Sequence, residues 1–345
     1  MIKINETPCR TSNNYGVNDV LVDEKVFERK INTFSGFEAK NASGIRFLNK
    51  SDAKNAKIIS KILDNQRKNQ GNFVKKIVFD KSQEETVVLN FKLQGDALVD
   101  TIEIEIKEGV NAKIVTNFDG NKNAYHNGLL KIVCQKDSRV DFAVMSDLKN
   151  DGNNFLSIDA KLFDGAVLNS HIIDFSSRYS IYNFYSSLNG DNSVSNLNVI
   201  YVSQKDNLVD LNCFQEIFGK NCRATIETVG ALKDEAAKNF KGTISFVRGC
   251  KKSFGSESEY CLLLSDTAKS KALPMLLCGE EDVDGKHSTA IGRADEKQLF
   301  YVMSRGLDYD SAIRLLVKSK LNSLLNKLFD EGLKGQILEK IDGRI

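Results

Sequence analysis

Short apolar runs, many with alternating hydrophobic and polar residues, fill the middle of the chain from residue 74 to about residue 283. A period of two along a run is typical of a β-strand with one buried face. Fifteen such runs occur, at residues 75–80, 85–93, 99–106, 112–118, 128–134, 139–146, 155–163, 166–175, 181–188, 195–202, 208–217, 223–232, 242–247, 260–265 and 273–278. The pattern predicts a strand-dominated domain.

Polar connectors with Gly and Asn at the turns separate these runs. Two architectures fit the pattern: a β-sandwich of antiparallel hairpins, and a parallel β-helix in which each strand stacks on the strand one full turn earlier. Periodicity alone does not separate them. A two-residue Asn-Gly or Asp-Gly turn between tightly spaced strands is nearly absent, which weakly favours the β-helix.

The region before the strands, residues 1–73, is predicted to be mixed and mostly helical. Within it, Ser51 fits the N-cap of a helix and Gly71 fits a left-handed stop. The apolar residues between them share one helix face, which comprises Ile58, Ile59, Ile62 and Leu63.

The region after the strands, residues 294–345, returns to the spacing of a helix. Asp295 and Gln298 form a capping box, and Gly306 fits the C′ position of that helix. Asp308 then caps a second helix, and a third segment repeats the pattern. Their apolar stripes must cover another surface; they comprise Ile313, Leu316, Val317, Leu321, Leu324, Leu325 and Leu328, and then Leu333, Ile337, Leu338 and Ile341.

Charge and composition argue against several classes of protein. Lys and Arg total 48 against 46 for Asp and Glu, so no charge excess indicates binding to nucleic acid or to an anionic membrane. No apolar run reaches the roughly 18 residues of a spanning helix, and the first residues lack the apolar segment of a secretory signal. We therefore expect a cytoplasmic protein.

The spacing of the cysteines indicates free thiols, and the loops lack the motif of a nucleotide-binding site. Seven cysteines are scattered without a tight pair such as Cys-x-x-Cys, at Cys9, Cys134, Cys213, Cys222, Cys250, Cys261 and Cys278. Reduced thiols are the default in the expected compartment. The phosphate-binding pattern GxxxxGK[ST] is absent, so we expect no intrinsic nucleotide.

Residues 226–328 resemble the SufB/SufD core family, which builds iron–sulfur cluster assembly scaffolds. The resemblance is carried by the runs NFKGTISFVRGCK, LLLSD, LPMLLC and EEDV, by His287 and Gly292, and above all by DEKQLFYVMSRGL at residues 295–307. It implies a mainly β fold, namely a right-handed parallel β-helix core at 74–293 between N-terminal and C-terminal α-helical regions.

The resemblance also implies partners. Members of the family bind a SufC-like ABC ATPase through the C-terminal helical region, here the helices between residues 295 and 328. Two β-helix subunits pair near their C-terminal turns, so the chain is expected to form a homodimer or a heterodimer with a SufB-like subunit. A transient iron–sulfur cluster is the expected cargo.

The departures from the family pattern place the chain closer to SufD than to SufB. SufB-like members have a sulfur-accepting cysteine six residues before Pro274, where this chain has Ala268. They have an acid directly after the histidine, where this chain has Ser288, and some SufD-like members have a cysteine at the position of Gly285. These differences argue against an autonomous sulfur-accepting role.

Two residues are the candidate metal ligands. His287 lies between an acidic stretch and a turn of small residues, in an exposed setting where a neutral imidazole binds iron or lines a subunit interface. Cys278, nine residues earlier, is expected to approach His287 from an adjacent turn of the β-helix. The alternatives are a histidine that hydrogen-bonds a turn and a cysteine that packs as a small apolar residue, as for Cys261. The acidic residues 280–284 either attract iron or form a solvated edge.

The resulting expectation is a non-enzymatic scaffold subunit of a SUF-type iron–sulfur cluster assembly system. One alternative is a degenerate family member that regulates the ATPase without binding iron, which the replacement of cysteine by Ala268 supports. A remote alternative is a carbohydrate-active β-helix, which the absence of Trp and of a secretory signal opposes.

Overall fold

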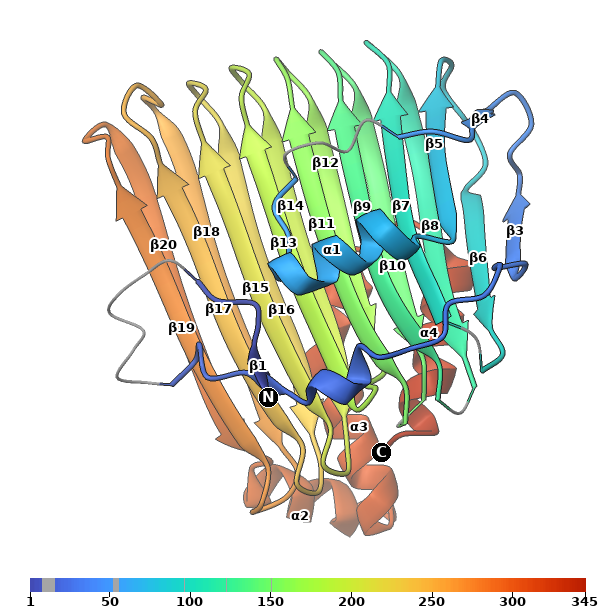
Figure 1. Ribbon diagram of the computed structural model, residues 1–345. Coiled ribbons are helices and arrows are strands. Elements are labelled where there is room, and N and C mark those ends of the chain that lie inside the picture. Colours follow the sequence, from blue (N-terminus) through green and yellow to red (C-terminus); the bar gives the residue numbers. More distant parts are fainter. Residues whose placement is uncertain (8–15, 52–55, 96, 122, 150) are drawn as a thin grey trace.

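The computed structural model describes all residues except 8–15, 52–55, 96, 122 and 150. The described chain winds into a β-solenoid of about eight turns, each with one strand in either of two facing sheets (Figure 1). Each core strand pairs in parallel with the strand two positions away in sequence. The expected mainly β, parallel β-helix fold is confirmed, and the β-sandwich is wrong.

Sheet I contains β3 (Phe37–Lys40), β6 (Val87–Leu93), β8 (Asn111–Gly120), β10 (Arg139–Asp147), β12 (Val167–Asp174), β14 (Val194–Ser203), β16 (Arg223–Leu232), β18 (Ser253–Leu263) and β20 (Val283–Arg293). Sheet II contains β4 (Arg46–Leu48), β5 (Phe73–Phe79), β7 (Ala97–Ile106), β9 (Tyr125–Cys134), β11 (Asn153–Leu162), β13 (Tyr179–Leu188), β15 (Leu208–Ile217), β17 (Ala237–Phe246) and β19 (Lys269–Cys278). The fifteen predicted runs coincide with β5 to β19, whereas β3, β4 and β20 were missed.

A column of left-handed turn residues shapes one edge of the β-helix. Asp137, Gly165 and Asn192 occupy equivalent turns, with φ of 56°, 63° and 60°. Each donates its backbone N–H to a carbonyl of the next turn, as Asp137 does to Asp164 at 2.8 Å. Asp, Asn and Gly adopt this conformation at the lowest cost, which explains the polar connectors between the strands.

The inward-facing residues form a continuous apolar core, with Leu156, Ile158 and Ala160 at most 1% exposed. Polar residues also enter this interior, because His126 is held between Asp100 (Nε2 to Oδ1, 2.9 Å) and Asn154 (Nδ1 to Oδ1, 2.8 Å). Both ring nitrogens therefore have protein partners. His126 is a core histidine and is not available to a metal.

The N-terminal region is less helical than predicted. It contains β1 (Ile2–Lys3), β2 (Leu21–Val22), a 3₁₀ turn η2 (Glu24–Val26) and α1 (Lys61–Gln70). Its apolar residues, including Ile4, Val20, Ile59 and Leu63, pack on the outer face of sheet II (Figure 1). The strands β3 and β4 pair antiparallel with β6 and β5 and close the N-terminal end of the β-helix.

The predicted start of α1 was wrong, whereas its predicted end at Gly71 is confirmed, although the conformation of this glycine differs from the prediction. Ser60 caps the helix, because its hydroxyl accepts the N–H of Leu63 at 3.4 Å. Ser51 lies outside the helix, and the predicted first turn at residues 52–55 falls outside the described residues. Gly71 ends the helix with φ −56°, so it is not a left-handed stop. A Cβ there would lie 2.6 Å from the carbonyl oxygen of Arg67, which explains the glycine.

Three α-helices follow the strands, as predicted: α2 (Glu296–Ser304), α3 (Tyr309–Leu325) and α4 (Glu331–Asp342). Asp308 caps α3, and Gly306 has the expected positive φ of 98°. Asp295 caps α2 by accepting the N–H of Lys297, one residue earlier than a capping box requires. The apolar stripes of α3 and α4 cover the outer face of sheet I, where Val317, Leu321, Leu324, Ile337 and Ile341 meet Met145, Ile173, Ile200 and Val202.

His171 is buried beneath the segment that joins α3 to α4. Its side chain is on the outer face of β12, is 2% exposed, and packs near Phe329 with the ring centres 6.1 Å apart. The charged residues Arg223, Glu227 and Lys327 line the groove beside it. Burial, assisted by the charge of Lys327, lowers the pKa of His171 to about 4.

This lowered pKa predicts a loss of stability in acid. The folded state favours the neutral ring, so its contribution to stability is complete above pH 6.5 and is lost as the pH falls toward 4. Protonation of His171 can lower the free energy of unfolding by about 3 kcal/mol at most. We expect His171→Asn to flatten the dependence of the unfolding free energy on pH in urea titrations. The control is His287→Asn, at an exposed histidine. If the unfolding free energy of wild type and of His171→Asn depended on pH in the same way, His171 would not be the source of the acid sensitivity.

Candidate functional site

The C-terminal end of the β-helix is open, in contrast to its N-terminal end. Among the described residues, no strand pairs with the outer edges of β19 and β20. Residues 284–290 of β20 are exposed, and Leu277 and Ile291 are each 42% exposed. Unpaired edge strands readily add a further strand, so this end is a natural site for a partner.

His287 lies in the middle of β20, not in a turn as predicted. Its register partner is Glu257 of β18, and the two side chains are on the same face of sheet I, the one that faces the interior. The imidazole is exposed because no further turn of the β-helix covers it within the described part of the chain. The small and polar residues of β20 resembled a turn because both faces of this last strand meet solvent.

Cys278 is the last residue of β19 and is exposed. The interpretation of Cys278 as a buried apolar residue is therefore wrong. Cys278 lies beside the connection between β19 and β20, whereas His287 is four residues into β20, about 13 Å along the strand. Among the described residues, no three His, Cys, Asp or Glu side chains gather as a metal site. The structure thus leaves the two predicted ligands on different sheets.

The other described cysteines are buried, whereas Cys9 lies outside the described residues. Burial raises the pKa of the Cys134 thiol to about 12 and that of Cys250 to about 11. Cys261 is fully buried, so its interpretation as a small apolar residue is confirmed. Buried thiols with raised pKa values are poor metal ligands and nucleophiles.

This chain has a methyl group at the position where the resemblance led us to look for a sulfur-accepting cysteine. Ala268 lies in the turn between β18 and β19 and is 8% exposed. Gly285 lies on β20, where a Cβ would be 3.2 Å from a methyl carbon of Leu276. Neither residue offers a ligand.

The acidic residues 280–284 organise a turn. Glu280 accepts the backbone N–H of Gly249 at 2.8 Å, and this bond, with those from Asp282 and Glu281, lowers the pKa of Glu280. Asp284 forms an exposed ion pair with Lys286 at 3.4 Å. These contacts favour the solvated-edge interpretation.

Sequence reasoning missed Glu257, the buried neighbour of His287. The side chain is 1% exposed, and neither carboxylate oxygen has a hydrogen-bond partner of normal geometry among the described residues. Burial raises the pKa of Glu257 to about 8, and the backbone N–H of Met275 opposes the shift. The alternation in SFGSESEY could have indicated an inward-facing Glu257, but only residues 260–265 were assigned to this strand.

An exposed apolar surface covers the helix α2 and the residues that follow it, up to the start of α3. Phe300 is 75% exposed and Tyr301 57% exposed, and Met303, Leu307 and Tyr309 are also exposed. We call these five residues the α2 apolar surface. No residue of α2 is buried. Exposed apolar patches of this kind are typical of sites that bind another protein.

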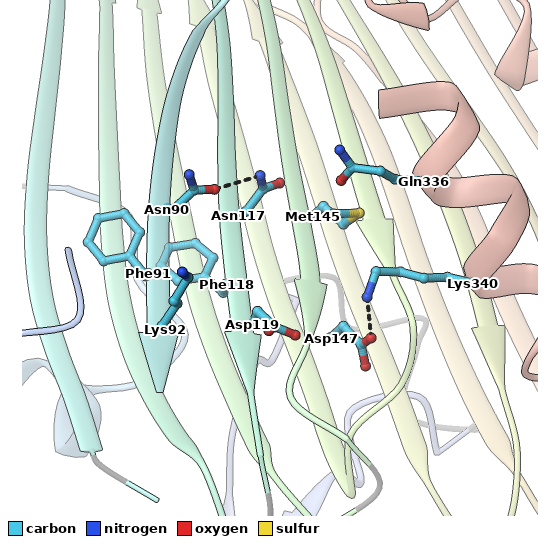
Figure 2. A pocket seen from close by; sticks show the side chains of 10 residues that line it. All are labelled: Asn90, Phe91, Lys92, Asn117, Phe118, Asp119, Met145, Asp147, Gln336 and Lys340. Atoms are coloured by element: carbon cyan, nitrogen blue, oxygen red, sulfur yellow. Dashed lines mark hydrogen bonds and ion pairs between the residues drawn. The ribbon is translucent and has the colours of Figure 1, made fainter. Parts of the chain in front are cut away.

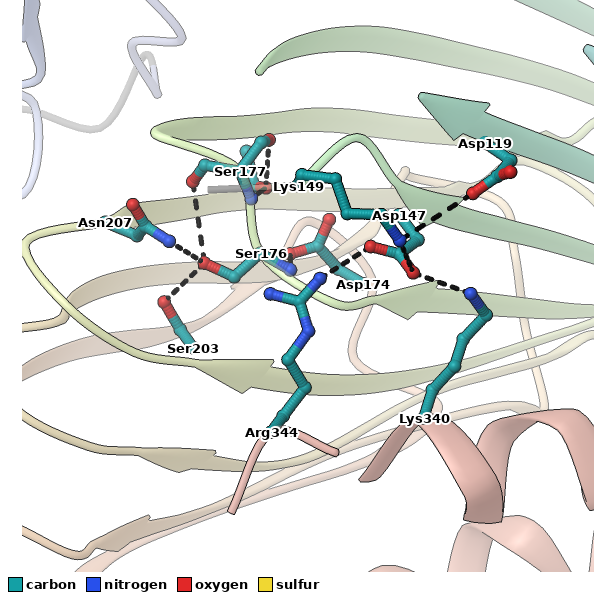
Figure 3. Close-up of polar contacts among 11 residues, drawn as sticks. Asp119, Asp147, Lys149, Asp174, Ser176, Ser177, Ser203, Asn207, Lys340 and Arg344 are labelled. Atoms are coloured by element: carbon teal, nitrogen blue, oxygen red, sulfur yellow. Dashed lines mark hydrogen bonds and ion pairs between the residues drawn. The ribbon is translucent and has the colours of Figure 1, made fainter. Parts of the chain in front are cut away.

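An ion cluster around the buried Asp147, here called the Asp147 clamp, fastens α4 to sheet I (Figure 3). Asp147 accepts hydrogen bonds from Lys340 and Arg344, both at 2.6 Å, and from Lys149 at 2.9 Å. Figure 2 shows the cavity beside it, of about 220 Å³, where Gln336 of α4 faces Asn117 of β8. The clamp fixes the C-terminal helices relative to the β-helix.

No helix within the described ranges combines the length and the apolar character that crossing a membrane would require.

Comparison with known proteins identifies the family. Residues 89–320 match the family model described as "SUF system FeS cluster assembly, SufBD core domain". The chain is 31% identical to the iron–sulfur cluster assembly protein SufD of Bacillus subtilis over 158 residues, which are 46% of this chain and 36% of that protein. It is 24% identical to SufD of Escherichia coli over 244 residues, 70% of this chain and 58% of that protein.

An iron–sulfur cluster assembly SufBD family protein of Pyrococcus horikoshii is 33% identical over 139 residues, 40% of this chain and 31% of that protein. The matched segments thus cover less than two thirds of each of these relatives. The family model, in contrast, covers more than half of this chain, from the second β-helix strand to the third helix. This protein therefore belongs to the SufBD core family of the SUF iron–sulfur cluster assembly system, and it is SufD-like.

Proposed function

We propose that the chain is a non-enzymatic scaffold subunit that works with a SufC-like ABC ATPase in the assembly of iron–sulfur clusters. The observation that carries the proposal is the α2 apolar surface, which directly follows the open C-terminal end of a SufBD core. An ATPase bound there lies next to the last turn of the β-helix. Nucleotide hydrolysis belongs to the partner, and the chain transmits the movement.

The open end supports a second contact. The backbone groups of β19 and β20 are unpaired on their outer edges within the described chain, and Leu277 and Ile291 are exposed beside them. We propose that another copy of this chain or a SufB-like subunit pairs with these edges. The transient cluster is the cargo of this junction, and His287 is its proposed ligand from this chain.

The second candidate is a family member that regulates the ATPase without binding iron. It is favoured by Ala268 and by the separation of Cys278 from His287. The carbohydrate-active alternative finds no support, because the comparisons match iron–sulfur assembly proteins.

The proposal predicts a specific complex with the ATPase. We expect the purified chain to bind a SufC-like ATPase in size-exclusion chromatography and isothermal titration calorimetry, because an apolar surface of this kind gains free energy when covered. Binding is expected to persist in His287→Ala, because this residue lies on β20 and not on α2. Failure of the wild-type chain to bind the ATPase, with and without ATP, would contradict the proposed function.

A further inference from the structure

The register of the last two strands of sheet I places a carboxylate next to the proposed cluster ligand. Glu257 and His287 are directly opposite in the parallel pair β18 and β20. Neighbouring strands in a sheet lie about 4.8 Å apart, and opposite residues share a face. The interior ends at this point, because β20 is the last strand of sheet I in the described chain. The two side chains therefore lie at the mouth of the β-helix.

Among the described residues, no side chain forms an ion pair or a hydrogen bond with the Glu257 carboxylate. It lies over Gly242 of β17, where a Cβ would be 1.9 Å from Oε1, so the glycine provides the space that it occupies. Glu259, two residues later on the same inner face, instead forms an ion pair with the buried Lys238. Only the backbone N–H of Met275 acts on the Glu257 carboxylate among the described residues, and not with normal hydrogen-bond geometry. A buried carboxylate that is so poorly paired costs several kcal/mol, and such a group commonly indicates a missing water, ion or ligand.

We propose that Glu257 and His287 together bind ferrous iron, or an iron atom of the cluster, at the mouth of the β-helix. Imidazole and carboxylate are a common pair of ligands for ferrous iron. The carboxylate lies over Gly242, and no hydrogen bond of normal geometry among the described residues holds it there. In the proposed site the Glu257 side chain turns from this position toward its register partner His287. Water, sulfide or a second subunit supplies the remaining ligands, since the open end exposes the site.

This inference rests on the proposed function for the identity of the metal, but its test is independent of the ATPase. We would measure the affinity for Fe(II) alone, under anaerobic conditions, by competition with a chromogenic chelator. The variants are Glu257→Gln, His287→Ala and their combination. Asp284→Asn is the matched control, because it removes one negative charge from an exposed residue on β20 itself.

We expect Glu257→Gln and His287→Ala each to weaken Fe(II) binding by about 10–100-fold, and Asp284→Asn to leave it unchanged. The double variant is expected to lose less than the product of the two single effects, because the ligands act as one site. Co(II) in place of Fe(II) reports the change of ligands in its visible absorption. Glu257→Gln is expected to unfold at the same or a higher urea concentration than wild type, which separates loss of a ligand from loss of folding.

Unchanged Fe(II) affinity in Glu257→Gln, with weakened binding in His287→Ala, would overturn the role of Glu257 and leave the proposed function standing. No Fe(II) binding by the wild-type chain would overturn the whole site and favour the regulatory alternative. Failure to bind the ATPase, with Fe(II) binding intact, would contradict the proposed function alone.

Discussion

Replacement of Phe300 and Tyr301 by alanine is expected to weaken binding of the SufC-like ATPase by about 100-fold or more. Both aromatic side chains are largely exposed, and aromatic residues dominate the binding energy of protein interfaces. The unfolding free energy should change little, because no residue of α2 is buried. Calorimetric titration of the double variant with the ATPase, beside urea unfolding, measures both quantities.

The control for this experiment is Phe218→Ala. Phe218 is 41% exposed, but it lies in the turn between β15 and β16, at the edge of the β-helix opposite to α2. The control should bind the ATPase as wild type does. Equal affinities of the double variant and wild type would show that the ATPase docks elsewhere and would remove the main support for the proposed function.

The Asp147→Asn variant is expected to lose about 2–4 kcal/mol of unfolding free energy, because it leaves Lys340 and Arg344 without their carboxylate partner. The estimate lies toward the lower end of the range for buried pairs because Lys340 and Lys149 are partly exposed. Amide hydrogens of α4 should exchange faster. Asp119→Asn is the control, since the Asp119 side chain is exposed and its ion pair in the described part of the chain is a long one, with Lys149 at 4.0 Å.

The Asp147 clamp also makes the free energy of unfolding depend on pH in a defined way. Burial raises the pKa of Asp147, but the bonds from Lys149 and Lys340 and the charge of Arg344 outweigh burial and hold this pKa below its usual value. The contribution to stability is therefore present above the pKa of an unfolded aspartate, about 4, and is lost as the pH falls further. The difference in unfolding free energy between wild type and Asp147→Asn, measured by urea titration, should therefore shrink as the pH falls below about 4. If this difference in unfolding free energy stayed constant down to pH 3, the stabilising role of the ionised Asp147 would be contradicted.

The strands could be predicted from the sequence because their inner faces are apolar and their turns require Gly, Asn or Asp. The alternation of apolar and polar residues failed to predict a strand where the strand has no apolar inner face or is very short. β20 has no buried apolar face, since no other described element covers it, and β3 and β4 are too short to show a period. The N-terminal region follows the surface of sheet II, and its conformation depends on contacts with Tyr125 and Phe155 that lie far away in the sequence.

The candidate site could be predicted only in part. His287 and the C-terminal helices were found through the family resemblance and through capping residues such as Asp308. The pairing of Glu257 with His287 depends on register between strands thirty residues apart, which local spacing does not reveal. The exposure of Phe300 was equally hidden, because an apolar residue in an amphipathic helix is normally taken to face the core.

The contrast between the two ends of the β-helix has a consequence for dynamics. In a solenoid each repeat touches only its neighbours, so a terminal repeat that is held on one side can detach without unfolding the remainder. The first repeat is protected by β3 and β4, whereas β19 and β20 pair with a strand on one side only among the residues that the structure describes. Local fraying, and the adaptability that goes with it, should therefore be concentrated in the repeat that carries His287.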